Sequence, residues 1–505
     1  MNLTQAKEAY LSVREKVTAL QLAYYLNSMD VETGIAPPAS FPFRGRQLAT
    51  IGDMIYDMTT SESFMEGVRT LAEAGDALGD PDLLHEARET LSQSEKVAKC
   101  PKEEYLAYST LLNEVYPIYV EAKHTSDFSL FEPYLQKIID YNRKYVGWVA
   151  TPERAGYDVL LDEYEKGFGQ KEYDAFFDLL REKLVPLIAR IAEKKLVYGD
   201  GFTKKLYSAE GQKRFCEYLA PVLCFDRDRT AMLESEHPFT NNNGNHDVRI
   251  TNHYYEDNLI SSIFSAIHEM GHALYELQVD DRFEGTGCGG GASLALHESQ
   301  SRFMENMVGR SPAFWERHFE ALREVFPDEL AGVTVQDFVC HVNRVEQSLI
   351  RTEADELTYS VHVLIRYELE KEMLSGKLNA KEIPAAWNAK YKEYLGVDVP
   401  CDREGCLQDM HWAGGSLGYF PTYALGSAYA AQIWAAMARD LDIEAAIRGT
   451  TLKEIAEWLR LHLHRYGSSR DPKELLLLAT GEPFDPHYYV DYLTEKYSRL
   501  YGIEA

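Results

Sequence analysis

One segment, residues 257–279, constrains the fold more than any other part of the chain. Its apolar residues recur every three or four positions, as in a strongly apolar helix. The motif His-Glu-Met-Gly-His occupies residues 268–272, so that on a helix His268 and His272 project from one face. Two such imidazoles can bind one Zn²⁺, and Glu269 lies beside them to take a proton from the metal-bound water. Without a metal, two unpaired imidazoles and a carboxylate on an apolar helix would cost free energy when buried. We therefore predict a zinc site here, with Glu269 as the general base.

A catalytic zinc needs a third protein ligand and an open position for water. The glycine-rich run 285–291 allows the chain to reverse, and residues 292–309 then have the pattern of a second helix. This second helix carries Glu298, which we favour as the third ligand, with His297 as the second choice. The alternative for Glu298 is an ordinary ion pair with Arg302, four residues further along the helix.

Composition excludes several classes of protein. The 505 residues include 80 acidic and 52 basic side chains, and the resulting net charge of −28 argues against nucleic acid or an anionic membrane as a partner. Seven cysteines in a chain of this length do not form a disulfide framework. The N-terminal residues are polar, and the longest apolar stretch, 423–438, is too short to span a bilayer. We expect a cytoplasmic protein.

Periodicity predicts a mainly α-helical fold. Apolar residues at spacings of three and four mark helices within residues 6–25, 48–74, 101–122, 134–149, 173–192 and 336–375. Residues 237–256 differ, because they pass through an Asn/Gly turn and alternate as strands do, which predicts a small β-hairpin. Since no interior linker is present, we expect a single domain over residues 1–505, divided at most into two lobes around a cleft.

Six blocks of the sequence resemble the carboxypeptidase Taq family of zinc metallocarboxypeptidases. In chain order they are His237-Pro238-Phe239, Asp247–Thr251, His268–His272, His297–Gln300, Ile350–Asp355 and Gly405–Trp412. The resemblance implies a large helical fold of the gluzincin type, similar to neurolysin and angiotensin-converting enzyme, with a deep substrate groove. It also implies a homodimer and one Zn²⁺ per chain, which Co²⁺ can replace.

Three of these blocks suggest substrate-binding residues. His237 precedes a proline and is by itself an ordinary turn residue, but the resemblance implies that it contacts the substrate backbone. Asp247 and Arg249 alternate on a strand, where either a cross-strand ion pair or an edge for an extended peptide is expected. Arg351 and Asp355 would form a salt bridge on a long helix. The functional alternative is that Arg351 holds the C-terminal carboxylate of the substrate in a bidentate clamp, with Arg249 as the second candidate.

The block at 405–412 leads into a segment rich in glycine and tyrosine. His411 and a phenol from this segment are suited to stabilise an oxyanion and to protonate a leaving amine. Tyr419 and Tyr423 are both candidates; the family pattern favours Tyr423 as the catalytic residue and leaves Tyr419 for substrate binding.

Together these features predict a metallocarboxypeptidase that acts on peptides with a free C-terminus and releases single amino acids with broad specificity. An oligopeptidase or a dipeptidyl carboxypeptidase with the same zinc site remains the alternative. A non-catalytic peptide-binding protein is disfavoured, because a structural zinc has no need of a general base such as Glu269.

Overall fold

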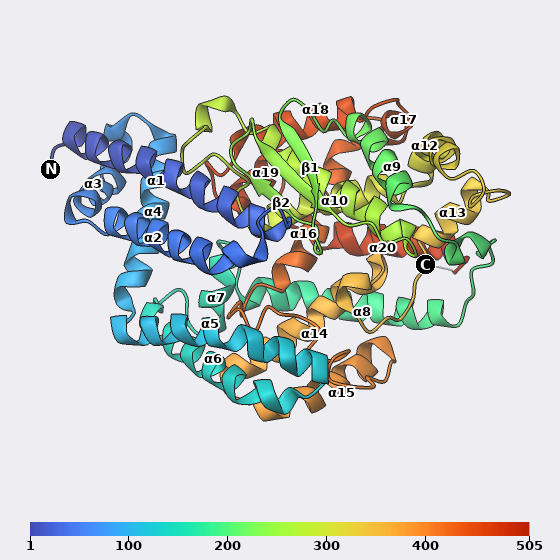
Figure 1. Ribbon diagram of the computed structural model, residues 1–505, viewed down its shortest axis with the longest axis horizontal. Helices are drawn as coiled ribbons and strands as arrows, with labels where there is room; N and C mark the ends of the chain where they lie inside the picture. The colour runs from blue at the N-terminus through green and yellow to red at the C-terminus, as the bar shows by residue number, and fades with distance from the viewer. Residues whose placement is uncertain (504–505) are drawn as a thin grey trace.

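The computed structural model of the protein describes residues 1–503 and is mainly helical, with one small sheet (Figure 1). The helices before the sheet are α1 (Leu3–Glu32), α2 (Phe41–Thr59), α3 (Glu62–Glu73), α4 (Pro81–Lys99), α5 (Lys102–Thr125), α6 (Phe128–Val149), α7 (Tyr157–Tyr164), α8 (Gln170–Ala192) and α9 (Ala209–Val222). After it come α10 (Leu259–Leu277), α11 (Leu294–Arg302), α12 (Pro312–Val325), α13 (Val335–Val342), α14 (Glu356–Ser375), α15 (Ile383–Leu395), α16 (Pro421–Met437), α17 (Ile443–Ile447), α18 (Lys453–His462), α19 (Pro472–Thr480) and α20 (His487–Tyr501).

The sheet contains the predicted hairpin and one further strand. Strands β2 (Thr240–Asn242) and β3 (Val248–Asn252) pair antiparallel, which confirms the hairpin expected within residues 237–256. Strand β1 (Thr230–Glu234) pairs parallel with β3, so the strand order is β1-β3-β2. Strand β1 was not predicted, because its three consecutive apolar residues, 231–233, do not show the alternation that marks a strand.

Two of the predicted helical segments are interrupted. Residues 48–74 belong to two helices, α2 and α3, which are separated at residues 60–61. Residues 336–375 contain α13 and α14, and the chain between them holds only a short 3₁₀ turn, Arg351–Glu353. Helix α14 begins where it does because the carboxylate of Asp355 accepts the N–H groups of Leu357 and Thr358, which is the geometry of an N-cap. The prediction of one long helix through Arg351 is therefore wrong.

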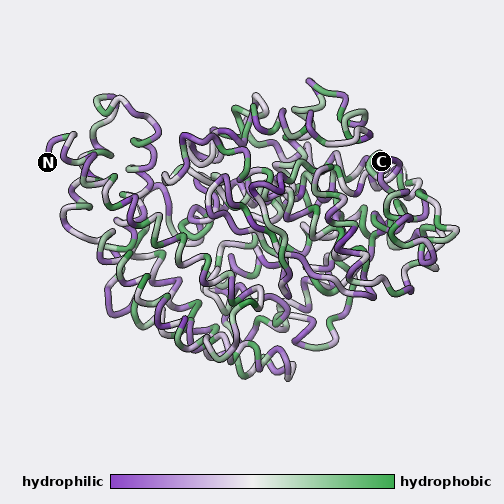
Figure 2. The backbone as a smooth tube through the Cα atoms, turned by 45° about the horizontal axis from the view of Figure 1, so that its top comes forward, coloured by the Kyte–Doolittle hydropathy of each residue, from purple (hydrophilic) through white to green (hydrophobic). Residues whose placement is uncertain are grey.

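The core lies in two parts. The larger one extends from α5 to α20 and surrounds α10, which packs against β3 and α11. A smaller apolar cluster joins α1, α3 and α4, which lie together at the N-terminal end of the molecule in Figure 1. Along the outer helices, hydrophobic and hydrophilic residues alternate, as in amphipathic helices (Figure 2). Within residues 1–503, no helix combines the length and the apolar character that crossing a membrane requires.

Candidate active site

Helix α10 carries both histidines of the predicted zinc site. Its first turn is capped by the side chain of Asn258, and 14 of its 19 residues are buried. Gly271, between the two histidines, lets α11 approach closely: a Cβ atom at this position would lie 2.7 Å from the carbonyl oxygen of Gln300 and 2.8 Å from the Cα of Ser301. The absence of a side chain at Gly271 therefore sets the distance between α10 and the helix that bears Glu298.

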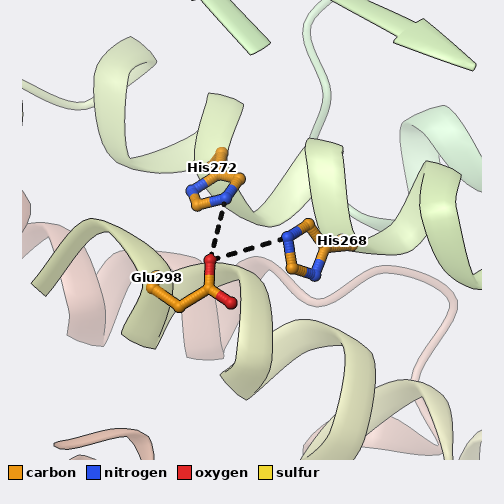
Figure 3. Close-up of side chains that lie close together, drawn as sticks. All are labelled: His268, His272 and Glu298. Carbon is orange, nitrogen blue, oxygen red and sulfur yellow. Dashed lines mark ion pairs between the residues drawn. The ribbon is translucent and has the colours of Figure 1, made fainter. Parts of the chain in front are cut away.

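Glu298 faces His268 and His272 across this contact (Figure 3). Its Oε2 atom lies 3.7 Å from Nε2 of His268 and 3.5 Å from Nε2 of His272. One ligand atom from each of the three residues lies within 4.8 Å of the others, so they form a candidate metal site. The other carboxylate oxygen accepts Nε of Arg302 at 2.7 Å. The two alternatives for Glu298, metal ligand and ion-pair partner, are thus compatible, since each uses a different oxygen.

The second nitrogen of each imidazole is held by another side chain. Nδ1 of His268 lies 2.9 Å from Oε2 of Glu305, and Nδ1 of His272 lies 2.5 Å from Nδ1 of His297. His297 in turn contacts Glu276 through its Nε2 at 2.6 Å. These contacts leave Nε2 of both ligand histidines directed at Glu298. His297 therefore lies beside the cluster and outside the set of three that could hold a metal.

Sequence reasoning gave no role to Glu305. It lies seven residues after Glu298, in the π-helix Phe303–Gly309 that continues α11, and it also accepts hydrogen bonds from Arg302 and Arg310. A spacing of two helical turns from a predicted ligand was the signal that could have identified it. A carboxylate behind a ligand histidine fixes the orientation of the ring and raises its basicity.

The residues present suit a divalent transition metal. Two imidazole nitrogens and one carboxylate oxygen form the donor set of many catalytic zinc sites. Burial alone would raise the pKa of Glu298, but Arg302 and the two histidines outweigh it and hold this pKa well below its usual range. The carboxylate is therefore ionised, as a metal ligand must be.

Glu269 is held by the sheet. Its Oε2 atom accepts the hydroxyl of Thr240, from β2, at 2.6 Å. Burial raises the pKa of Glu269, so the position favours a group that exchanges a proton. Sequence reasoning missed Thr240, because its contact with Glu269 joins a strand to a helix far along the chain.

His411 and Tyr423 also lie together. Nε2 of His411 is 3.1 Å from the hydroxyl of Tyr423, and the ring of Tyr419 packs against both. Burial has the larger effect on His411, and the charge of Arg351 adds to it; together they lower the pKa of His411 to about 4, so this imidazole is neutral at physiological pH. Burial raises the pKa of Tyr423 well above its usual range, which keeps the phenol protonated and able to donate.

Comparisons with known proteins decide the family. The model of the carboxypeptidase Taq (M32) metallopeptidases matches residues 10–497. The chain belongs to this family. It is 36% identical to carboxypeptidase 1 of Bacillus subtilis (strain 168) over 502 residues, which cover 99% of this chain and 100% of that protein. It is 42% identical to thermostable carboxypeptidase 1 of Pyrococcus furiosus over 383 residues, 75% of this chain and 76% of that protein.

A solved structure agrees with this assignment. The M32 carboxypeptidase of Deinococcus radiodurans R1 superposes with a TM-score of 0.94 at 34% identity, and the match covers 99% of this chain and 100% of that one. The protein is therefore a metallocarboxypeptidase, an enzyme that removes residues from the C-termini of peptides, and the resemblance seen in the sequence is confirmed.

The guanidinium of Arg351 in this carboxypeptidase forms hydrogen bonds with two neighbouring side chains, Asp409 and Tyr359. Its Nε and Nη2 atoms donate to Oδ1 of Asp409 at 3.1 and 2.8 Å, and Nη1 donates to the hydroxyl of Tyr359 at 2.9 Å. The predicted i, i+4 ion pair with Asp355 does not form, because Arg351 lies in the 3₁₀ turn and Asp355 caps α14. The guanidinium lies over the ring of Tyr423, 4.8 Å from its centroid.

Arg249 belongs to β3, and His237 lies in the loop before β2. Arg249 forms a bidentate pair with Asp247, which directly precedes β3, so the pair does not join two strands. In the sheet register Thr240, which contacts Glu269, is opposite Ile250, so Arg249 points to the other face. There it borders a cavity of about 740 Å³ that is otherwise lined by residues of α1 and α2 and by Ser40. His237 is exposed, and its carbonyl oxygen accepts the hydroxyl of Ser235.

Proposed function

We propose that this carboxypeptidase holds one Zn²⁺ through His268, His272 and Glu298 and releases single amino acids, with broad specificity, from peptides that have a free C-terminus. The observation that supports the proposal is the convergence of two Nε2 atoms and one carboxylate oxygen on a shared point, next to Glu269. When bound, the metal would polarise the scissile carbonyl and acidify a water molecule.

Glu269 is the proposed general base. It takes the proton of the attacking water and passes it to the amine that leaves when the peptide bond breaks. The hydroxyl of Thr240 holds one carboxylate oxygen of Glu269, so that the other oxygen is oriented for the transfer. The raised pKa of Glu269 supports the second half of this cycle, in which the residue must hold a proton.

His411 and Tyr423 are proposed to stabilise the negative charge that develops on the carbonyl oxygen. The neutral imidazole and the protonated phenol can each donate a hydrogen bond, and their contact at 3.1 Å orients them relative to each other. Tyr419, which packs against both rings, is the proposed substrate-binding phenol.

Arg351 is the proposed clamp for the substrate carboxylate. It is preferred to Arg249 because its guanidinium lies over Tyr423, whereas Arg249 points to the face of the sheet away from α10. Asp409 already holds Nε and Nη2, so the carboxylate would replace the hydroxyl of Tyr359 at Nη1. His237, in the loop before β2, is proposed to contact the peptide backbone.

The role of Arg351 can be tested with a double cycle of enzyme and substrate. Arg351→Lys keeps the positive charge but loses Nη1, which would bind the carboxylate while Nε and Nη2 hold Asp409, so kcat/KM for a free-acid peptide should fall. Amidation of the peptide should cost the parent enzyme much more than the variant, because the partner of the carboxylate is already gone. Equal amidation penalties in both enzymes would remove Arg351 from this role, and Arg249→Lys would then be measured in the same way.

Digestion of one defined peptide tests the function as a whole. We expect single amino acids from the free-acid peptide, little product from the amidated peptide, and no product after a chelator has removed the metal. Dipeptides would instead indicate a dipeptidyl carboxypeptidase, and internal cleavage would indicate an oligopeptidase. Elemental analysis of the purified enzyme would identify the metal, and reloading with Co²⁺ would test whether it replaces Zn²⁺.

Three further properties are proposed with this function. Residues 1–505 form a single domain, which the span of the family match supports.

The enzyme is a homodimer: α2 exposes large apolar side chains, Phe43, Met54 and Tyr56, which a second copy would cover. It acts in the cytoplasm, in keeping with seven cysteines that are all unpaired. Sedimentation of the purified protein tests the dimer, and cell fractionation tests the compartment.

A further inference from the structure

Glu370 is a fully buried carboxylate near the middle of the protein, and no role has so far been given to it. It lies on α14 and forms no ion pair within the described part of the chain, residues 1–503. The two cations nearest to it along α14, Arg366 and Lys371, are bound to Asp409 and Asp174 instead. A buried charge without a partner is costly, so the hydrogen bonds that Glu370 makes must compensate for it.

Three neutral donors surround this carboxylate. One oxygen accepts Nε1 of Trp412 at 2.7 Å. The other accepts the hydroxyl of Tyr157 at 2.6 Å and the backbone N–H of Gly418 at 2.8 Å. Glu370 therefore joins α14, α7 and the segment 412–418, which lie far apart in the sequence.

The two donors in that segment sit next to the proposed catalytic residues. Trp412 directly follows His411, and Gly418 directly precedes Tyr419. Gly418 has a φ of +97°, and a Cβ there would lie 2.9 Å from the carbonyl oxygen of Leu160, so the segment is packed tightly against α7. Glu370 thus fixes both ends of the segment in one place.

The imidazole of His411 packs against the rings of Tyr419, Phe420 and Tyr423. Its Nε2 contacts Tyr423, but its Nδ1 is buried without a hydrogen-bond partner among the residues described. Tyr419 and Phe420 directly follow Gly418, so the orientation of the imidazole depends on the segment that Glu370 binds at Trp412 and Gly418.

We propose that Glu370 is a positioning residue for peptide hydrolysis: by binding Trp412 and Gly418, it holds the segment that places His411 against Tyr423. This inference rests on the catalytic roles proposed above for His411 and Tyr423. Glu370 itself does not touch the substrate and acts only through this segment.

Glu370→Gln is the central test. A glutamine offers an acceptor at only one end of its amide, whereas the donors approach both oxygens of Glu370, so at least one donor must lose its partner. We expect kcat to fall by about 10- to 100-fold, the scale of a small misplacement of a reacting group. Metal content should stay at the parental level, because Glu370 contacts none of the candidate ligands.

Glu356→Gln is the matched control. Glu356 lies on the same helix and is also buried, but its partners, Tyr492, Lys496 and Tyr497, belong to α20. If loss of a buried carboxylate on α14 acted only by destabilising the fold, both variants would lose kcat alongside thermal stability. We expect the Glu356→Gln enzyme to keep the parental kcat. Trp412→Phe provides a milder variant that removes a single donor, and it tests the inference should Glu370→Gln fail to fold.

A cycle with His411→Ala separates positioning from general damage. In the His411→Ala background, the further loss of kcat caused by Glu370→Gln should be several-fold smaller than in the parent enzyme. Equal losses in both backgrounds, or parental kcat in both Glu370→Gln and Trp412→Phe, would overturn the inference and leave the proposed function intact. Parental kcat in His411→Ala itself would overturn the proposed role of His411, and the inference with it.

Discussion

Gly271→Ala is the substitution that most directly tests how the metal site is assembled. The added Cβ would lie 2.7 Å from the carbonyl oxygen of Gln300, whereas ordinary contact begins near 3.4 Å. Because these neighbours are backbone atoms of α11, no side chain can turn aside to make room. Helices α10 and α11 must therefore separate by about 0.7 Å, since packed interiors have little free volume.

The consequence should be larger for metal binding than for stability. Overpacking lowers the free energy of unfolding by about 1–3 kcal/mol, and the better helix propensity of alanine offsets about 1 kcal/mol of this loss. The ligands are less tolerant: His268 and His272 lie on α10 while Glu298 lies on α11, and metal–ligand distances vary by only about 0.2 Å. We expect the affinity for Zn²⁺ to fall by about 10- to 100-fold, as in variants that disturb the support of a metal ligand.

Competition with a chromophoric chelator would measure the affinity, and thermal unfolding of the metal-free enzyme would measure the stability. Gly147→Ala is the control, because Gly147 also lies within a helix but a Cβ there would meet nothing within 4 Å. It should leave Zn²⁺ affinity unchanged. Parental affinity in the Gly271→Ala enzyme would refute the reasoning, since it would mean that the α10–α11 distance does not control the ligand geometry.

Three other substitutions have expected outcomes. Glu269→Gln should keep the metal, measured by elemental analysis, but lower kcat by about 10²- to 10⁴-fold; parental turnover by the metal-loaded variant would exclude the residue as the base. Glu305→Gln should weaken metal binding about 10- to 100-fold in a chelator competition, because the carboxylate behind His268 is lost; unchanged affinity would show that this contact is dispensable. Burial raises the pKa of Glu165 to about 7, from about 4.3 in an unfolded chain. Between these two pH values the native state binds more protons than the unfolded state, so the free energy of unfolding falls as the pH rises. Glu165→Gln should flatten this decline in urea unfolding at pH 5 and 8, and an identical pH dependence in both proteins would contradict the assignment.

The sequence by itself determined the elements whose signals are local. The spacing of apolar residues predicted about half of the helices that the structure describes, and the four-residue spacing of His268 and His272 placed both imidazoles on one face of α10. The glycine-rich run followed by a helical pattern led to Glu298, which the structure brings within 4 Å of both histidines. Each of these inferences uses residues that are close in the chain, where the geometry of a helix or turn fixes how side chains lie relative to one another.

The tertiary structure alone decided which groups hold these residues in place. Thr240 reaches Glu269 from the sheet, Asp409 occupies the guanidinium of Arg351, and Glu370 binds the segment after His411. The apolar periodicity of residues 336–375 could not show that α14 begins only after Asp355, which caps its first turn. Arg351 therefore lies before this helix, in a short 3₁₀ turn. The physical reason is that such contacts join segments separated by tens of residues, and their pairing depends on how whole helices pack.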